Sequence, residues 1–270
     1  MTQNKTNTGQ IARQRTAKAL LGAALVLGLA ACATPPPADD PIAVAEFKAT
    51  NDPIEPLNRD VFEFNLGVDR YFLKPVAKGY RTVVPELGRD GLRNVVNNLQ
   101  EPVTFINDVL QGEFDRAGTT FGRFLVNSTI GIGGLFDVAG TQQGMDRHVE
   151  DFGQTLATYG APEGPYLVVP FLNSTSVRHG VGRIVDAYSN PLFYAFDHAG
   201  EEWVQPTAMA IDVIDARSRN IESLDEIERT AIDFYATARS AYRQDREKEI
   251  NNGIAPEPTD NDVDPFDVDY

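Results

Sequence analysis

The sequence has very few of the residues on which catalysis, metal binding and disulfide bonds usually depend. Its 270 residues include one cysteine and three histidines. A single cysteine allows no intramolecular disulfide and no all-cysteine zinc site. The histidines His148, His179 and His198 lie far apart, and none has a second metal ligand at helical spacing. We therefore expect no metal and no cofactor.

Catalytic motifs are missing as well. The chain contains no Gly-x-Ser-x-Gly elbow, no His-Glu-x-x-His pair, no phosphate-binding loop and no dinucleotide-binding glycine fingerprint. Arg147 and His148, followed by Glu150 and Asp151, have two interpretations: a general acid–base group, or a charged helix start at which Asp151 caps the turn at Phe152. The second is favoured. The sequence therefore predicts a protein that is not an enzyme.

Basic residues are scarce. The chain has 24 Lys and Arg against 39 Asp and Glu, which gives a net charge of −15. Proteins that bind the nucleic-acid backbone gather Lys and Arg, so nucleic acid is excluded as a partner. Simple electrostatic docking on anionic lipid is disfavoured for the same reason. With 42% hydrophobic residues the chain can still bury a core, in one or at most two domains.

The N-terminal segment explains the single cysteine. Residues 1–18 carry four basic residues and no acid, and an apolar run follows from Ala19 to Ala31, too short to span a bilayer. The run ends at Leu29-Ala30-Ala31-Cys32, which resembles a bacterial lipobox, so we expect cleavage before Cys32 and its acylation. The alternative is an ordinary signal peptide with Cys32 incidental. Removing four basic residues takes the net side-chain charge from −15 to −19.

These features divide the chain into four parts. They are a lipoprotein signal peptide (1–31), a lipidated cysteine with a Pro-rich tether (32–51), a folded domain (52–250) and an acidic tail (251–270). The tail contains six acids and no base, and we interpret it as solubilising rather than as bait for a basic partner. Position 33 is Ala rather than the Asp that retains many lipoproteins at an inner membrane. The outer membrane is therefore the expected location, with acyl chains as the anchor.

The folded domain is predicted to be mainly α-helical. Helices are expected to open near Pro53, Pro75, Pro85 and Pro102, because the first helical turn tolerates the missing N–H of proline. A further helix is expected over 113–127 after Gly112, with apolar residues at 3.6-residue spacing on one face. After a loop-rich middle, in which only 166–169 looks extended, residues 203–250 return to helix, with a stripe at Ile232, Tyr235, Arg239 and Tyr242. No part of the mature chain reaches the 18 or so uncharged apolar residues of a transmembrane helix.

The most unusual segment is an apolar run, residues 124–140, that contains Gly131, Gly133 and Gly134. Each glycine costs a helix interior about 1 kcal/mol relative to alanine. The run could be a tight turn between two core helices. It could also be a flexible amphipathic element that lines a path for a molecule with a polar head and apolar tails, and this second interpretation is favoured.

Several ordered motifs between about Asp52 and Gly253 resemble the MlaA (VacJ) family of outer-membrane phospholipid-binding lipoproteins. They are Asp52-Pro53-Ile54-Glu55-Pro56-Leu57-Asn58-Arg59 with Phe62, Phe64 and Asn65; Asn97-Asn98-Leu99-Gln100-Glu101-Pro102 with Leu110-Gln111-Gly112; the run from Arg123 to Ala139; and Glu150-Asp151-Phe152-Gly153-Gln154-Thr155-Leu156 with Tyr159-Gly160. The chain departs from the family pattern at Ala161-Pro162-Glu163 and Val177-Arg178-His179, which puts the local loop geometry in doubt.

The resemblance implies a single ring-like helical domain in the inner leaflet of the outer membrane, with a central amphipathic channel. Such proteins remove phospholipid misplaced in the outer leaflet and pass it to a soluble periplasmic carrier, usually while bound to trimeric porins. The candidate channel residues are Asn127, Ser128, Thr129, Ile130, Gly131, Ile132, Gly133, Gly134, Leu135 and Phe136.

Other candidate roles follow from the first motif. Phe62, Phe64 and Asn65 are expected to gate or support the channel, although the phenylalanines are equally suited to core packing, and Asn58-Arg59 is expected to tie helices together. The alternative function is a structural lipoprotein that bridges the outer membrane to the cell wall or the division machinery. A membrane-bound lipase is disfavoured because the sequence lacks a nucleophile.

Overall fold

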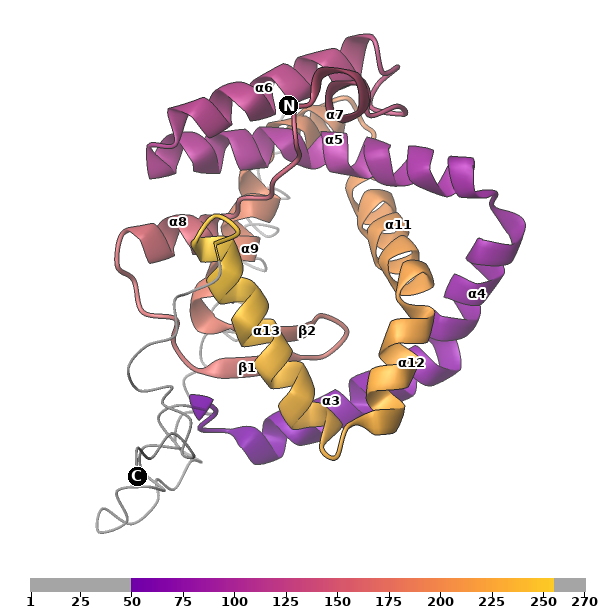
Figure 1. The fold of residues 1–270 in the computed structure, drawn as a ribbon, viewed down its shortest axis with the longest axis vertical. Helices are drawn as coiled ribbons and strands as arrows, with labels where there is room; N and C mark the ends of the chain where they lie inside the picture. Colours follow the sequence, from indigo (N-terminus) through magenta and orange to yellow (C-terminus); the bar gives the residue numbers. More distant parts are fainter. Residues whose placement is uncertain (1–49, 255–270) are drawn as a thin grey trace, which may run out of the picture.

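The structure is a computed structural model that describes residues 50–254. The predicted lipidation site Cys32, the signal peptide, most of the tether and the tail from residue 255 lie outside the described residues. Figure 1 shows that the described helices follow one another around a ring. This confirms the prediction of one mainly helical domain.

The ring has four sides. Helix α5 (Glu86–Gln111) forms one side, with α6 (Phe114–Thr129) packed along its outer face and the short α7 (Val138–Gln143) beside them (Figure 1). The elements of the other sides are α3 (Glu55–Val68), a π-helix (Asp69–Leu73), α4 (Lys74–Val83), α8 (Phe152–Thr158), β1 (Tyr166–Val169), β2 (Asn173–Ser176), α9 (Val177–Ser189), α10 (Pro191–His198), α11 (Val204–Arg219), α12 (Ile221–Thr230) and α13 (Phe234–Ile250). In Figure 1, α3 lies opposite α5, α4 lies with α11 and α12 on one flank, and α13 lies with the β-hairpin on the other.

Proline and glycine positions account for several helix ends. Pro75 occupies the first turn of α4, Pro85 caps α5, and Gly112 ends α5 with a left-handed φ of 80°. The helix expected to start at Pro102 does not exist as a separate element, because Pro102 lies inside α5. An interior proline removes a backbone hydrogen bond and crowds the preceding turn. In the turn before Pro102, the carbonyl of Leu99 accepts a hydrogen bond from Asn190 Nδ2 at 3.1 Å, which ties this part of α5 to the start of α10.

The expectation of a loop-rich middle was wrong. Residues 138–198 form α7, α8, α9 and α10, and Asp151 caps α8 by accepting from Gln154 N at 2.9 Å, as the favoured interpretation of that segment predicts. Glycines in α9 had weakened its helical pattern. Gly182 is required there because a Cβ would collide with the backbone of Gly153 where α8 and α9 cross. Ile232, placed in the α13 stripe, instead lies before the helix and is fully exposed.

The apolar core is small and lies beside the β-hairpin. Phe62, Tyr166, Val168 and Tyr235 form one buried cluster. The hairpin is antiparallel, with Tyr166 opposite Ser176. Asn58 extends the pairing from α3: its Nδ2 donates to the carbonyl of Tyr166 at 3.0 Å and its Oδ1 accepts from Val168 N at 2.9 Å. Asn58 was predicted to tie helices together, and it instead ties α3 to the β-hairpin.

Elsewhere the helices pack mainly through polar groups. Among the described residues, polar and charged side chains outnumber apolar ones in the fully buried set. Between α5 and α6, Thr120 Oγ1 donates to Asp108 Oδ2 at 2.7 Å and Arg123 Nε donates to Glu101 Oε1 at 3.2 Å. At the same time many large apolar side chains are exposed. This distribution is the reverse of the usual one for a water-surrounded protein.

Candidate functional site

The glycine-containing segment forms a tight turn between α6 and α7. Three successive residues, Ile132, Gly133 and Gly134, have positive φ values of 55°, 68° and 90°. Gly134 N donates to the carbonyl of Asn127 at 2.8 Å, and Phe136 N donates to the carbonyl of Gly131 at 3.0 Å. The turn interpretation therefore describes the backbone correctly, and its hydrogen bonds fix the local geometry.

Two of the three glycines are required by packing. A Cβ on Gly134 would lie 2.5 Å from Asn98 Cβ on α5, closer than carbon atoms approach. A Cβ on Gly131 would overlap the carbonyl oxygens of Phe136 and Asn127. Gly133, in contrast, has open space where a Cβ would stand. The turn is thus pressed against α5 at Gly134 and faces outward at Gly133.

Buried polar groups hold the turn in place. Asn127 Nδ2 donates to Asp137 Oδ1 at 2.9 Å, and Asn127 Oδ1 accepts from Ala139 N at 3.0 Å. Arg123 donates to the same Asp137 carboxylate at 3.1 Å. Burial raises the pKa of Asp137, but the hydrogen bonds from Asn127 and Gly140 N and the charge of Arg123 outweigh it and lower the pKa overall. Asp137 is therefore held ionised at the base of the turn.

The outer rim of the turn is apolar and accessible. Ile130, Ile132, Leu135 and Phe136 are exposed, Ile132 to 68%. Ser128 accepts from Asn98 Nδ2 at 2.9 Å and Thr129 donates to the carbonyl of Leu125 at 2.6 Å, so these hydroxyls are engaged within the protein. Exposed apolar side chains continue along α6 at Phe114, Phe121 and Leu125. The predicted channel residues thus combine a polar, buried base with an apolar, exposed edge.

The first-motif residues lie far from this turn along the ring. Phe62 belongs to the buried core, and Asn65 is buried with its Nδ2 donating to the carbonyl of Val169 at 3.0 Å and its Oδ1 accepting from Phe171 N at 2.9 Å. Phe64 is half exposed and packs edge-to-face on Phe171 at a centroid distance of 5.3 Å. The positions of Phe62 and Asn65 suit support of the hairpin, whereas Phe64 is accessible. Arg59 binds Asp233 at 2.7 Å and so links α3 to the start of α13, as expected.

Three charged residues, Glu101, Arg147 and Asp212, lie between α5, α6 and α11, and the sequence did not predict that they come together. Burial raises the pKa of Glu101 and lowers that of Arg147, whose Nε lies 3.9 Å from Glu101 Oε1. Asp212 on α11 is exposed, yet the surrounding protein raises its pKa, against the influence of Arg147. Glu101 belongs to the motif 97–102 and Arg147 to the charged segment 147–151, but Asp212 belongs to no motif, so nothing in the sequence indicated that the three lie together.

The histidines are involved in structural contacts. His148 Nε2 lies 3.0 Å from Asp108 Oδ1 and 3.2 Å from Thr120 Oγ1, inside the α5–α6 network. His179 stacks on Tyr242, and burial, with the charge of Arg246, lowers the pKa of His179 to about 4. Within residues 50–254 no helix has the length and apolarity needed to cross a membrane.

The fold and the site define a class: ring-shaped helical proteins with polar helix contacts and an apolar, accessible periphery. The chain belongs to the MlaA lipoprotein family, whose model matches residues 50–249.

Individual relatives agree with this assignment. The chain is 38% identical over 206 residues to the intermembrane phospholipid transport system lipoprotein MlaA of Haemophilus influenzae, covering 75% of this chain and 80% of the relative. It is 33% identical over 245 residues to the protein of the same name from Escherichia coli, covering 89% and 90%. A solved structure described as the structural basis for maintenance of bacterial outer membrane lipid asymmetry superposes with a TM-score of 0.67 at 34% identity, over 74% of this chain and 99% of that chain.

Proposed function

We propose that the protein is an outer-membrane lipoprotein that extracts mislocalised phospholipid from the outer leaflet and passes it to a periplasmic carrier. The names of the relatives support this function. The observation in the structure that carries it is the turn 130–137, which combines buried polar anchors with an exposed apolar rim. A phospholipid presents the same two chemistries, a charged headgroup and apolar tails.

The apolar periphery supports contact with lipid beyond the acyl anchor. Exposure of the apolar side chains of α6 and the turn to water would be unfavourable. Removing one large apolar side chain from water stabilises the protein by about 1.5–3 kcal/mol. Lipid tails or the apolar wall of a trimeric porin would cover them. Cys32 acylation would then fix the domain at the membrane without electrostatic docking, in agreement with the negative net charge.

Residues 127–136 would lie on or beside a central amphipathic channel. Moving a phosphate headgroup through hydrocarbon is costly, and a route with polar groups lowers that barrier while the tails remain in apolar surroundings. Gly133 and the exposed Ile132 and Phe136 are the positions best placed to contact lipid. The process needs no covalent step, because a carrier with higher affinity for phospholipid would give the transfer its direction.

Mass spectrometry of the protein purified in mild detergent tests this function. Phospholipid is expected to co-purify, and cells that lack the protein are expected to show more aminophospholipid accessible to a membrane-impermeant amine reagent. If the folded protein carries no lipid and the accessible lipid is unchanged, the protein instead bridges the outer membrane to the cell wall or the division machinery.

A further inference from the structure

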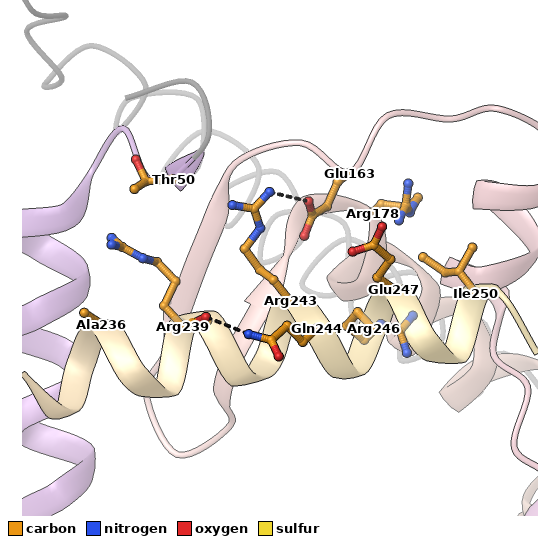
Figure 2. Close-up of a pocket in the computed structure, with 11 residues that line it drawn as sticks. Thr50, Glu163, Arg178, Ala236, Arg239, Arg243, Gln244, Arg246, Glu247 and Ile250 are labelled. Carbon is orange, nitrogen blue, oxygen red and sulfur yellow. Dashed lines mark hydrogen bonds and ion pairs between the residues drawn. The ribbon is translucent and has the colours of Figure 1, made fainter. Parts of the chain in front are cut away.

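A groove of about 680 Å³ runs along α13, away from the turn and the α5–α6 hairpin. One wall is the face of α13 from Ala236 to Ile250, and the other includes Glu163 and Arg178 (Figure 2). This volume lies in the range of sites that enclose ligands or peptide segments. The groove is independent of the proposed lipid route.

The groove is rich in arginine although the protein is acidic. Its lining residues include four arginines and two glutamates. Arg239 pairs with Asp52 at 2.8 Å and Glu55 at 3.1 Å, and Arg246 pairs with Asp151 at 2.7 Å and Glu249 at 2.6 Å. These carboxylates neutralise two of the guanidinium groups and hold them in position.

Arg178 differs from these two arginines. Arg243 lies 3.9 Å from Glu163, whereas Arg178 Nη1 donates to the carbonyl of Ala161 at 2.8 Å and, among residues 50–254, Arg178 forms no ion pair with a carboxylate. A guanidinium has five N–H donors and binds carboxylates in a two-pronged geometry. Arg178 can therefore bind an incoming carboxylate without breaking an existing ion pair.

The chain itself supplies a carboxylate-rich segment next to the groove. Helix α13 ends in a turn in which Asn252 and Gly253 have positive φ values of 56° and 84°, and Gly253 N donates to the carbonyl of Lys248 at 2.8 Å. Such a turn ends the helix and changes the direction of the chain. Residues 255–270 follow, with six acids and no base.

Reach and proximity favour this segment. The helix face from Ala236 to Ile250 is about 21 Å long at 1.5 Å per residue, whereas sixteen residues can extend to about 50 Å. A directly attached segment has an effective concentration of the order of millimolar, so a weak site is occupied. We propose that the acidic C-terminal segment, residues 255–270, binds back along α13 in this groove, with a carboxylate on Arg178.

Disulfide trapping in the full chain tests this inference. Both variants carry Cys32→Ser and Asn261→Cys. The first adds Ser240→Cys, which lines the groove. The second, the control, adds Ala241→Cys, which is exposed but does not line the groove. Both pairs keep all six tail acids and have the same reach. Under mild oxidation the Ser240 pair is expected to cross-link at least fivefold more than the Ala241 pair.

The charge dependence is tested in the same assay. Arg178→Gln is expected to lower the Ser240 cross-link at least threefold. Arg229→Gln, which removes an equal charge from the exposed end of α12, should leave it unchanged. Equal trapping of both pairs, an unaffected yield in Arg178→Gln, or cross-links only between two chains would overturn the inference. So would trapping of the tether, through Ala45→Cys, in place of the tail.

Discussion

Two adjacent glycines in the turn, when each is replaced by alanine, separate the effect of packing on the free energy of unfolding from the effect of backbone strain. Gly133 and Gly134 both have positive φ, so alanine at either position incurs the left-handed penalty of about 1–2 kcal/mol. Only at Gly134 would the new methyl group strike α5, at 2.5 Å from Asn98 Cβ. Asn98 would have to move, and its hydrogen bond to Ser128 would be lost at about 0.5–1.5 kcal/mol. Overpacking adds about 1–3 kcal/mol.

The two substitutions should therefore differ. Gly133→Ala is expected to lower the free energy of unfolding by about 1–2 kcal/mol, from the left-handed penalty alone. Gly134→Ala is expected to lower it by about 2.5–6.5 kcal/mol, because the overpacking and the lost hydrogen bond are added. For a domain of this size the difference corresponds to a Tm about 3–18 °C lower for Gly134→Ala. Thermal unfolding followed by circular dichroism in one detergent measures it. Equal Tm values, or a lower value for Gly133→Ala, would refute the contact between the turn and α5.

Three further outcomes are expected. Arg123→Met should destabilise the protein by about 3–5 kcal/mol in denaturant titration, because it leaves the buried Glu101 with only the more distant Arg147, at 3.9 Å; a loss below 1 kcal/mol would contradict the buried pair of Arg123 and Glu101. His179 has a folded-state pKa of about 4, below its ordinary 6.5, so the unfolded chain binds the proton more tightly and stability should fall as pH decreases from about 6.5 to 4. His179→Gln should flatten that part of the pH profile, and an unchanged profile would show that His179 is not responsible. Ile132→Ser, at an exposed position, should leave the Tm unchanged and lower the amount of co-purified phospholipid, whereas Val83→Ser, equally exposed on α4, serves as the surface control.

Helix ends were predictable where a single residue determines them, and helix continuity was not. Gly112 ends α5 because only its left-handed conformation completes the turn, and this is visible in the sequence. Pro102 looked like a helix start because proline fits the first turn, but it lies inside α5, where Asn190, 88 residues further along the chain, binds the carbonyl of Leu99 in the preceding turn. Long-range contacts of this kind leave no local pattern.

The candidate site shows the same limit. The three glycines were compatible with a tight turn or with a flexible lining element, the favoured interpretation, and neither predicted that Gly134 packs on Asn98 while Gly133 faces open space. Asp212 was missed, and its proximity to Arg147 was not predicted, because the two residues are distant in the sequence and share no motif. The pair Asn58 and Arg59 was predicted to tie helices together: Arg59 links α3 to the start of α13, whereas Asn58 links α3 to the β-hairpin.

The periodicity of α6 predicts a helix with one apolar face, but it does not predict what surrounds that face. Its apolar residues recur at 3.6-residue spacing, which identifies one face of a helix but not what that face contacts. In a water-soluble protein this face would form the core. Here Thr120, Arg123 and Asn127 face α5 and are buried, whereas Phe114 is 70% exposed and Phe121 and Leu125 are about half exposed. The helix is amphipathic in the expected way, but its apolar stripe is largely exposed, with Ala117 as its buried member. The apolar stripe therefore requires a lipid or protein surface to cover it, and the polar stripe supplies the specific contacts that hold the ring together.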